Sequence, residues 1–185
     1  SRTIVESCQR LGWAPDIIHC NDWHTALVPF LLKSMYEWDA MFRDTRTLLT
    51  IHNIGYQGTF PRDAIEDLGL GAWTGMFDRQ DLEGDRVNFL RTGLIYADII
   101  STVSPTYARE IQTSEYGMGL EHQLRARHCS LTGILNGVDY AEWNPENHAL
   151  IPHNYSDKKL AGKDKDKKSL TKEMGLEYKF DRPMF

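Results

Sequence analysis

The sequence has few cysteines, no long apolar run and no excess of basic residues, and each absence argues against a class of protein. The three cysteines, Cys8, Cys20 and Cys129, are odd in number and far apart, which argues against a disulfide framework and suits a reducing compartment. No apolar run approaches the roughly 20 residues of a membrane helix, and residues 1–16 lack the basic and apolar regions of a signal peptide. With 26 acidic and 21 basic residues, no overall positive field favours nucleic acid or an anionic membrane as a partner.

Several catalytic signatures are also missing. No GxGxxG follows an apolar strand and no P-loop GxxxxGK[ST] occurs, so a nicotinamide oxidoreductase on a similar sheet stays an alternative without its fingerprint. No Gly-x-Ser-x-Gly elbow supports a hydrolase nucleophile. The segment "YGMGLE" (116–121) is glycine-rich and precedes an apolar helix. It is either a loop that presents backbone N–H groups to an anion or a plain loop with two turn glycines.

What the chain does contain is an alternation of short apolar strands and helices. Its 185 residues are 41% hydrophobic, enough for a core without staples. We expect strands at 16–20, 45–51, 98–103 and 130–135, and helices at about 25–37 with a bend at Pro29, 85–96, from Ser104 and Pro105 onward, and 165–174 with an end at Gly175. Such an alternation predicts an α/β fold with a parallel sheet.

The charge-dense run at 154–169 has little apolar content. It favours a solvated linker or helix face over a nucleic-acid patch.

Polar, turn-rich segments follow each expected strand: "NDWH", "HNIGYQG", "SPTY" and "NGVD". Right-handed crossovers place the carboxyl ends of parallel strands at one edge of the sheet. Ligands of such folds bind at that edge. The sequence therefore predicts one crevice lined by these four segments.

His52 and Asn53 stand where the strand "TLLTI" ends. A histidine here could donate to a ligand hydroxyl or act as an acid or base, or it could cap its own loop. Gly55 and Gly58 permit a positive φ or a close backbone approach, although a tight turn alone would also explain each of them.

Asp22 and Trp23 form a pair suited to a sugar, with hydroxyls bound by the carboxylate and an apolar ring face by the indole. The alternative is an N-cap at Asp22 and core packing of Trp23. Asn136 ends the fourth strand in an "NG" pair. No strand follows that pair, so a hairpin is disfavoured and the amide is free to face the crevice.

A metal site is a rival interpretation. Metal-ligand residue types occur at His19, Cys20, Asp22, His24 and His52. No pair among them has an established zinc spacing such as HExxH or CxxC.

Taken together and in order, five segments resemble the bacterial glycogen synthases and plastid starch synthases. These segments are "PDIIHCNDWHTALVPFLLK", "TIHNIGYQGTF", "NFLRTGLIYADIISTVSPTYAREI", "YGMGLE" and "GILNGVDYAEWNP". The resemblance implies a retaining glycosyltransferase that moves glucose from ADP-glucose to the non-reducing end of an α-1,4-glucan, with no metal or other cofactor. It implies a Rossmann-like parallel sheet with helices on both faces, within the N-terminal domain of a GT-B fold.

The resemblance also assigns domains and roles. Residues 1–153 match the later part of the N-terminal domain, and residues 154–185 match the interdomain link and the start of a C-terminal domain that completes the cleft. His52 matches the active-site histidine beside the transferred glucose. Substrate-binding positions match Asp22, Trp23, His24, Asn53, Tyr56, Gln57, Gly119, Leu120 and Asn136.

Two readings of the isolated chain follow from the resemblance. The chain is the acceptor-side half of a synthase, inactive by itself because the family's phosphate-binding residues lie elsewhere, or it is a non-catalytic glucan-binding module. The partners expected are ADP-glucose and an α-1,4-glucan, with no nucleic acid and no membrane, in a bacterial cytoplasm or a plastid stroma.

Overall fold

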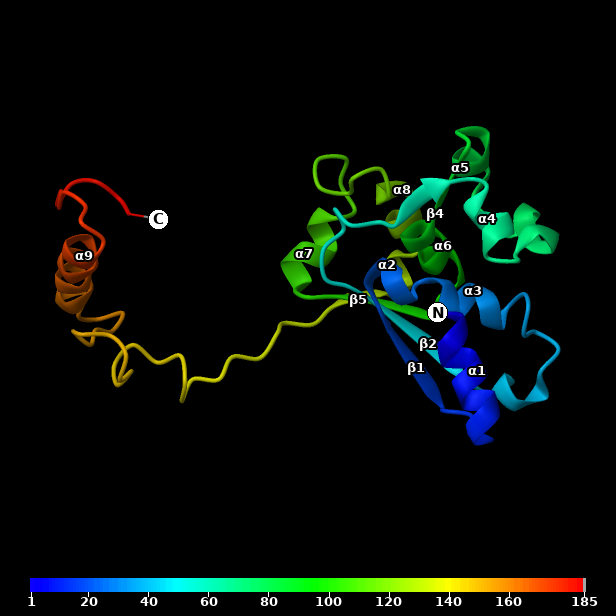
Figure 1. The fold of residues 1–185 in the computed structure, drawn as a ribbon, viewed down its shortest axis with the longest axis horizontal. Coiled ribbons are helices and arrows are strands. Elements are labelled where there is room, and N and C mark those ends of the chain that lie inside the picture. Colours follow the sequence, from blue (N-terminus) through cyan, green and yellow to red (C-terminus); the bar gives the residue numbers. More distant parts are fainter. Residues whose placement is uncertain (185) are drawn as a thin grey trace. The chain divides into compact units, whose positions relative to one another are not determined.

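A computed structural model describes residues 1–184 and divides the chain into two compact units after Asn136 (Figure 1). The boundary predicted at 153/154 falls inside the second unit. Residues 137–184 of the second unit contain the helix α9 (Ala161–Glu173). The elements of the first unit are α1 (Arg2–Leu11), β1 (Ile17–Asn21), α2 (Asp22–Thr25), α3 (Leu27–Leu32), η1 (Ala40–Phe42), β2 (Arg46–Ile51), β3 (Thr59–Pro61), α4 (Ala64–Asp67), η2 (Gly71–Met76), α5 (Arg79–Glu83), β4 (Arg86–Asn88), α6 (Phe89–Tyr96), β5 (Ile99–Thr102), α7 (Pro105–Glu110), α8 (Glu121–Ala126), η3 (His128–Ser130) and β6 (Leu131–Gly133).

The main sheet has four parallel strands in the order β1-β2-β5-β6. Each strand pairs with the next strand of this sheet along the chain, so every connection is a crossover through helices in the same direction. All four carboxyl ends therefore meet at one edge, as the sequence predicted. The α/β class with a parallel sheet flanked by helices is confirmed.

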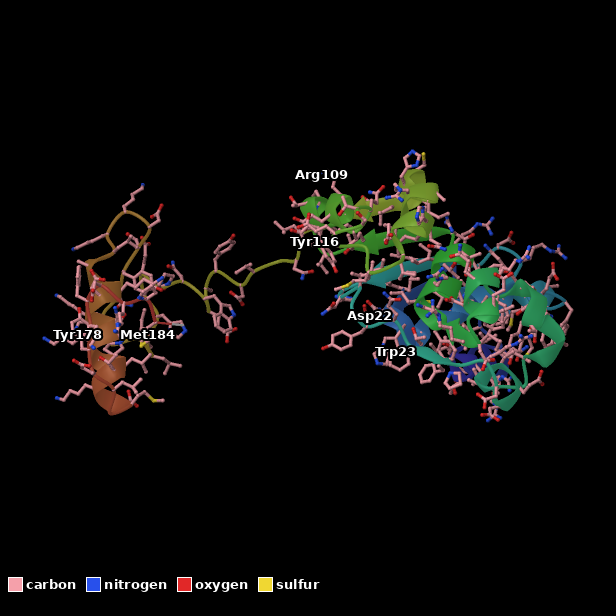
Figure 2. All side chains as sticks on the ribbon, turned by 90° about the horizontal axis from the view of Figure 1, so that it is seen from above. Asp22, Trp23, Arg109, Tyr116, Tyr178 and Met184 are labelled. Carbon is pink, nitrogen blue, oxygen red and sulfur yellow. The ribbon has the colours of Figure 1, made fainter. Side chains whose placement is uncertain are left out.

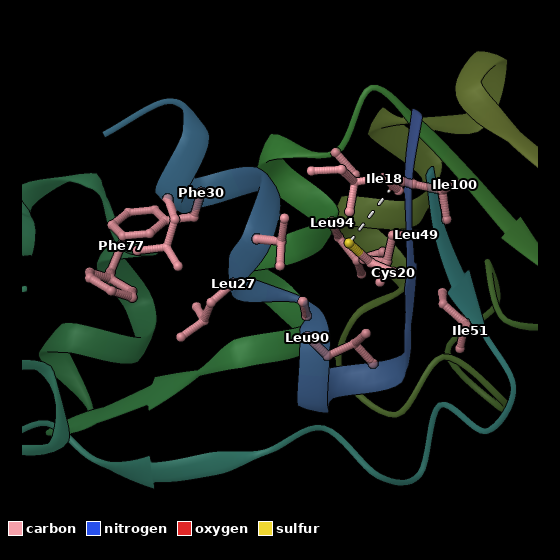
Figure 3. Close-up of a cluster of buried hydrophobic side chains, with 14 of the residues drawn as sticks. Ile18, Cys20, Leu27, Phe30, Leu49, Ile51, Phe77, Leu90, Leu94 and Ile100 are labelled. Atoms are coloured by element: carbon pink, nitrogen blue, oxygen red, sulfur yellow. Dashed lines mark hydrogen bonds between the residues drawn. The ribbon is translucent and has the colours of Figure 1, made fainter. Parts of the chain in front are cut away.

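The core lies between one face of this sheet and the helices α1, α3 and α6. Figure 3 shows the part of it that lies between the sheet and α3 and α6. Cys20, Leu49 and Ile100 point into it from three neighbouring strands and are fully buried. Gly93 lets α6 come close, because an added Cβ would lie 2.7 Å from the Ala26 Cβ and 2.9 Å from a methyl of Leu49. Burial raises the pKa of the Cys20 thiol to about 12, so this cysteine is a neutral core side chain.

The other face of the sheet is partly open. Ile17 is 62% exposed and Ile99 is 48% exposed. Two residues further along these strands a polar row crosses three strands: the His19 Nε2 lies 2.6 Å from the Thr50 hydroxyl, which lies 2.6 Å from the Ser101 hydroxyl. These hydrogen bonds satisfy polar groups that an apolar face would otherwise leave unpaired.

Two predicted helices are shorter than expected. The helix predicted at 25–37 is wrong in its bounds: α2 ends at Thr25 and α3 ends at Leu32, followed by turns. Pro29 lies in the first turn of α3, where its missing N–H costs nothing. The helix predicted at 85–96 begins only at Phe89, because residues 86–88 form β4, which pairs antiparallel with β3.

The predicted helix ends are confirmed at two places. The Ser104 hydroxyl accepts a hydrogen bond from the Tyr107 N–H at 2.9 Å, with Pro105 at the first helical position. The helix α9 ends at Glu173 and Gly175 follows with a φ of 66°, as a glycine after a helix end should. Most of the charge-dense run belongs to α9, which makes it largely a helix rather than an irregular linker.

No helix within residues 1–184 combines the length and apolar character needed to cross a bilayer.

Candidate functional site

Asp22 joins the carboxyl ends of the first two strands. It follows β1 directly and has a φ of 52°, a left-handed conformation that non-glycine residues rarely adopt. This backbone turns the carboxylate toward β2, where its Oδ1 accepts the His52 N–H at 2.8 Å. The predicted N-cap role of Asp22 is wrong, because Asn21 holds the N-cap position of α2.

The ring of His52 is oriented by Asn21. The His52 Nε2 lies 2.9 Å from the Asn21 Oδ1. Because an amide oxygen only accepts, Nε2 donates this bond. Asn21 was not among the predicted site residues, although it opens the segment "NDWH" and its amide could have been read with Asp22.

The indole of Trp23 is fixed from two sides. Gly58 has a φ of 62°, and an added Cβ there would lie 2.4 Å from the indole. The His24 ring stacks on the indole with a centroid distance of 4.0 Å. Trp23 is partly exposed and packs against the core, so its core packing is confirmed and its sugar-binding role stays a prediction. Figure 2 shows Asp22 and Trp23 together at one end of the first unit.

Asn53 shapes its own loop. Its Oδ1 accepts the Gly55 N–H at 2.9 Å, and a Cβ on Gly55 would lie 3.1 Å from that same oxygen. Gly55 therefore allows the close approach of the Asn53 side chain. Gly58 allows both the close approach of the Trp23 indole and a positive φ. Tyr56 follows with its side chain 68% exposed.

Gln57 holds two loops together. Its Nε2 donates to the Ile54 carbonyl at 3.1 Å and to the Met118 carbonyl at 3.0 Å, while its Oε1 accepts from the Asn88 amide at 2.6 Å. The loop after β2 therefore lies against the "YGMGLE" segment. Because both polar atoms of its side chain are hydrogen-bonded within the protein, Gln57 holds the two loops together in this structure.

Gly119 and Leu120 lie in that second loop. Gly119 has a φ of 83°, and its carbonyl accepts from Arg91 at 3.1 Å. Leu120 is fully buried, and its N–H donates to the Gly117 carbonyl at 2.8 Å, so this residue is not exposed to a ligand here. Asn136 is exposed and is the last residue of the first unit. The ligand-binding roles of these three residues stay predictions.

Sequence reasoning missed a buried ion cluster beneath the second loop. Arg91 and Asp81 are 6% and 2% exposed, and the Arg91 Nε lies 3.1 Å from the Asp81 Oδ2. These two atoms form an ion pair without hydrogen-bond alignment. Asp78 adds a second carboxylate at 3.3 Å from Arg91 Nη1. An arginine inside the apolar stretch "NFLRTGL" was the available indication.

The residues of the rival metal interpretation are not gathered. His19 and Cys20 point to opposite faces of β1, and Cys20 is fully buried. Among residues 1–184, no three His, Cys, Asp or Glu side chains are grouped closely enough to hold a metal ion.

Comparison with known proteins gives consistent results. Residues 1–126 match the family model described as the starch synthase catalytic domain. The chain is 45% identical over 184 residues to a glycogen synthase of Thermodesulfovibrio yellowstonii, covering 100% of this chain and 37% of that protein. It is 48% identical over 174 residues to a glycogen synthase of Myxococcus xanthus, covering 94% of this chain and 36% of that protein.

One solved structure is also similar, the catalytic domain of starch synthase IV from Arabidopsis thaliana bound to ADP and acarbose. It aligns with a TM-score of 0.71 at 37% identity, over 95% of this chain and 36% of that one. The chain thus spans little more than a third of the length of these relatives.

Proposed function

The chain belongs to the starch synthase catalytic domain family, and from this premise we propose that it supplies the acceptor-side wall of a retaining glycosyltransferase site. The reaction proposed is transfer of glucose from ADP-glucose to the non-reducing end of an α-1,4-glucan. The sheet described above is the corresponding part of the N-terminal, Rossmann-like domain of a GT-B fold.

The observation that supports this proposal is the link between the first two strand ends. The bond from the His52 N–H to the Asp22 carboxylate fixes the two segments in one place, with the Trp23 indole beside them. A carboxylate, an oriented imidazole and a partly exposed indole are the groups that bind sugar hydroxyls and a sugar's apolar face.

The chemistry of transfer fits these groups. Departure of ADP leaves positive charge on the sugar ring, which carbonyl and carboxylate dipoles stabilise when they are held in place beforehand. The carbonyl of His52 and the carboxylate of Asp22 both lie at the carboxyl-end edge of the sheet, where we propose that the sugar binds. The cations that stabilise the diphosphate belong, in this proposal, to the rest of the protein, and the reaction requires no metal or cofactor.

The solved relative supports the ligand classes. That protein was captured with ADP and acarbose, so we propose an adenine nucleotide sugar and a glucan as partners of the protein that contains this chain.

Replacing His52 tests the proposal. In the full-length protein, His52→Ala should lower the incorporation of labelled glucose into glycogen by at least about 100-fold, because the oriented imidazole, a donor or acid–base group, is lost while the backbone carbonyl is kept. His128→Ala is the matched control, since His128 is exposed and precedes β6 at the opposite edge of the sheet. Circular dichroism should show that both variants are folded.

Turnover by His52→Ala close to that of the parent protein would remove His52 from the site.

The isolated 185-residue chain should bind a malto-oligosaccharide without transferring glucose to it. Incorporation by this chain alone would show that the remaining wall is not needed.

A further inference from the structure

Apolar side chains are exposed on the two loops that Gln57 joins. Tyr56 is 68% exposed, Tyr116 is 48% exposed and Met118 is 63% exposed. The hydrogen bond from Gln57 to the Met118 carbonyl places the two loops side by side. Asp22, Trp23 and Tyr116 lie at the same end of the first unit (Figure 2), so these side chains continue the candidate site outward.

The backbone at Met118 is held in an unfavourable conformation. Its φ is 51°, in the left-handed region that an unbranched apolar residue gains nothing by adopting. Such conformations persist only where the surroundings fix them, and they gather at binding and catalytic sites. In this conformation the apolar side chain of Met118 is exposed to solvent, and the packing of the loop does not explain why.

The surroundings do fix this loop. Gln57 binds the Met118 carbonyl at 3.0 Å, and Arg91 binds the Gly119 carbonyl at 3.1 Å. Arg91 is itself held by Asp78 and Asp81 in the buried ion cluster. A buried charged cluster beneath a surface loop gives a rigid support, which lowers the entropy cost of binding a ligand on that loop.

We propose that Tyr56, Tyr116 and Met118 form an acceptor platform, a surface that binds the apolar faces of successive glucose rings in an α-1,4-glucan. This inference rests on the proposed function and names residues that extend its acceptor side. Tyrosine rings stack on the C–H face of a pyranose while their hydroxyls bond to sugar hydroxyls. A methionine side chain adapts to the irregular surface between two rings. A glucan is the occupant favoured because the platform is continuous with the Asp22–Trp23 end of the candidate site.

Titration of the 185-residue chain with maltoheptaose, followed by calorimetry and by amide chemical shifts, tests the platform. Tyr116→Ala should weaken binding by about fivefold, in line with the loss of one aromatic contact. Tyr116→Phe should bind nearly as well as the parent chain, because the ring is kept.

Met118→Gly separates the side chain from the loop conformation. Glycine adopts a φ near 51° without strain, so the loop should keep its shape while the apolar side chain is removed. Binding should weaken severalfold with no loss of thermal stability. Trp13→Ala is the control, since Trp13 is 60% exposed but lies before β1, at the opposite edge of the sheet.

Each outcome has a distinct meaning. Weakened binding in Tyr116→Ala and Met118→Gly, with Trp13→Ala unchanged, supports the platform. Equal binding by all variants overturns the platform and leaves the proposed function standing. No binding of maltoheptaose by the parent chain contradicts the acceptor role in the proposed function, and the platform fails with it.

Discussion

Two structural properties of Asp22, its hydrogen-bond partner and its backbone conformation, could not be predicted from its amino-acid type. Residue chemistry sufficed to select Asp22, Trp23 and His52 from the sequence. It did not reveal that the Asp22 carboxylate binds a backbone N–H of the next strand, or that the backbone is left-handed there. Both depend on where β2 lies relative to β1, which local sequence does not determine.

The three cysteines differ in accessibility, and this gives a test at the residue scale. Cys8 and Cys20 are buried, and Cys129 is exposed. We expect one thiol to react quickly with a disulfide reagent in the native protein and all three to react after denaturation. Counting the released thiolate by absorbance checks this, and Cys129→Ser should abolish the fast phase. Fast reaction of a second thiol would contradict the burial of Cys8 in α1 or of Cys20 in β1.

At the scale of elements, the sequence predicted the order of strands and helices but not their lengths. The main strands were found because each is an apolar run between polar turns. The three-residue strands β3 and β4 are too short to show a period of two. Where one helix was predicted from residue 25, the structure has a break at Ala26, between α2 and α3. The Thr25 hydroxyl bonds to both the N–H and the carbonyl of Asn21. Such a side-chain bond competes with helix continuation.

Asp98 connects β2 to the start of β5. Its Oδ2 accepts the N–H and the hydroxyl of Thr47, each at 2.8 Å, and Lys33 lies 3.4 Å from Oδ1. Burial raises the pKa of this carboxyl, but the Thr47 hydrogen bonds and the Lys33 charge outweigh it, so the pKa is lowered from its ordinary value.

Asp98→Asn should therefore lower the free energy of unfolding at pH 7 by about 1–3 kcal/mol. The lowered pKa means that the carboxylate stabilises the fold above the ordinary aspartate range, and that this contribution is lost as the pH falls through the folded value. The difference between parent and variant in urea unfolding should shrink in acid. A difference that stays constant down to pH 3 would argue against a charged Asp98.

Arg91 connects α5, α6 and the loop before α8. Arg91→Met should destabilise the protein by about 1–3 kcal/mol, because Asp81 then keeps only the partly exposed Arg86, 3.2 Å from its Oδ1, as a counter-charge, and the Gly119 carbonyl loses its donor. Arg79→Met is the matched control: the Arg79 side chain is 91% exposed in its pair with Glu83, and such pairs contribute little. Denaturant unfolding compares the two. Equal losses of unfolding free energy in the two variants would mean that the buried ion pairs of Arg91 stabilise the protein no more than the exposed pair of Arg79.

At the scale of the whole molecule, the chain consists of two units, each with its own packing. The sequence marked a change of composition near residue 154, whereas the first compact unit ends at Asn136. The intervening residues include exposed aromatic and aliphatic side chains, a type that usually indicates a core in a sequence: Val138, Tyr140, Trp143 and Leu150. Hydrophobicity alone could not reveal that these side chains face solvent.

Limited proteolysis should find this division. Chymotrypsin should cut first after Tyr140 and Trp143, which are 76% and 68% exposed. The larger fragment should keep the melting temperature and near-ultraviolet circular dichroism of the first unit. Mass spectrometry identifies the sites, and early cleavage within β2 or α6 would contradict the division.

Gly58 illustrates how an orientation can be encoded by missing atoms. The indole of Trp23 occupies the volume that any side chain at position 58 would fill. A change from glycine to alanine adds only one methyl group and ranks as mild by chemical similarity. Here that methyl would meet an aromatic ring and a left-handed backbone together, so the position accepts a single amino acid. Any requirement for the orientation of the indole is therefore also a requirement for glycine at position 58.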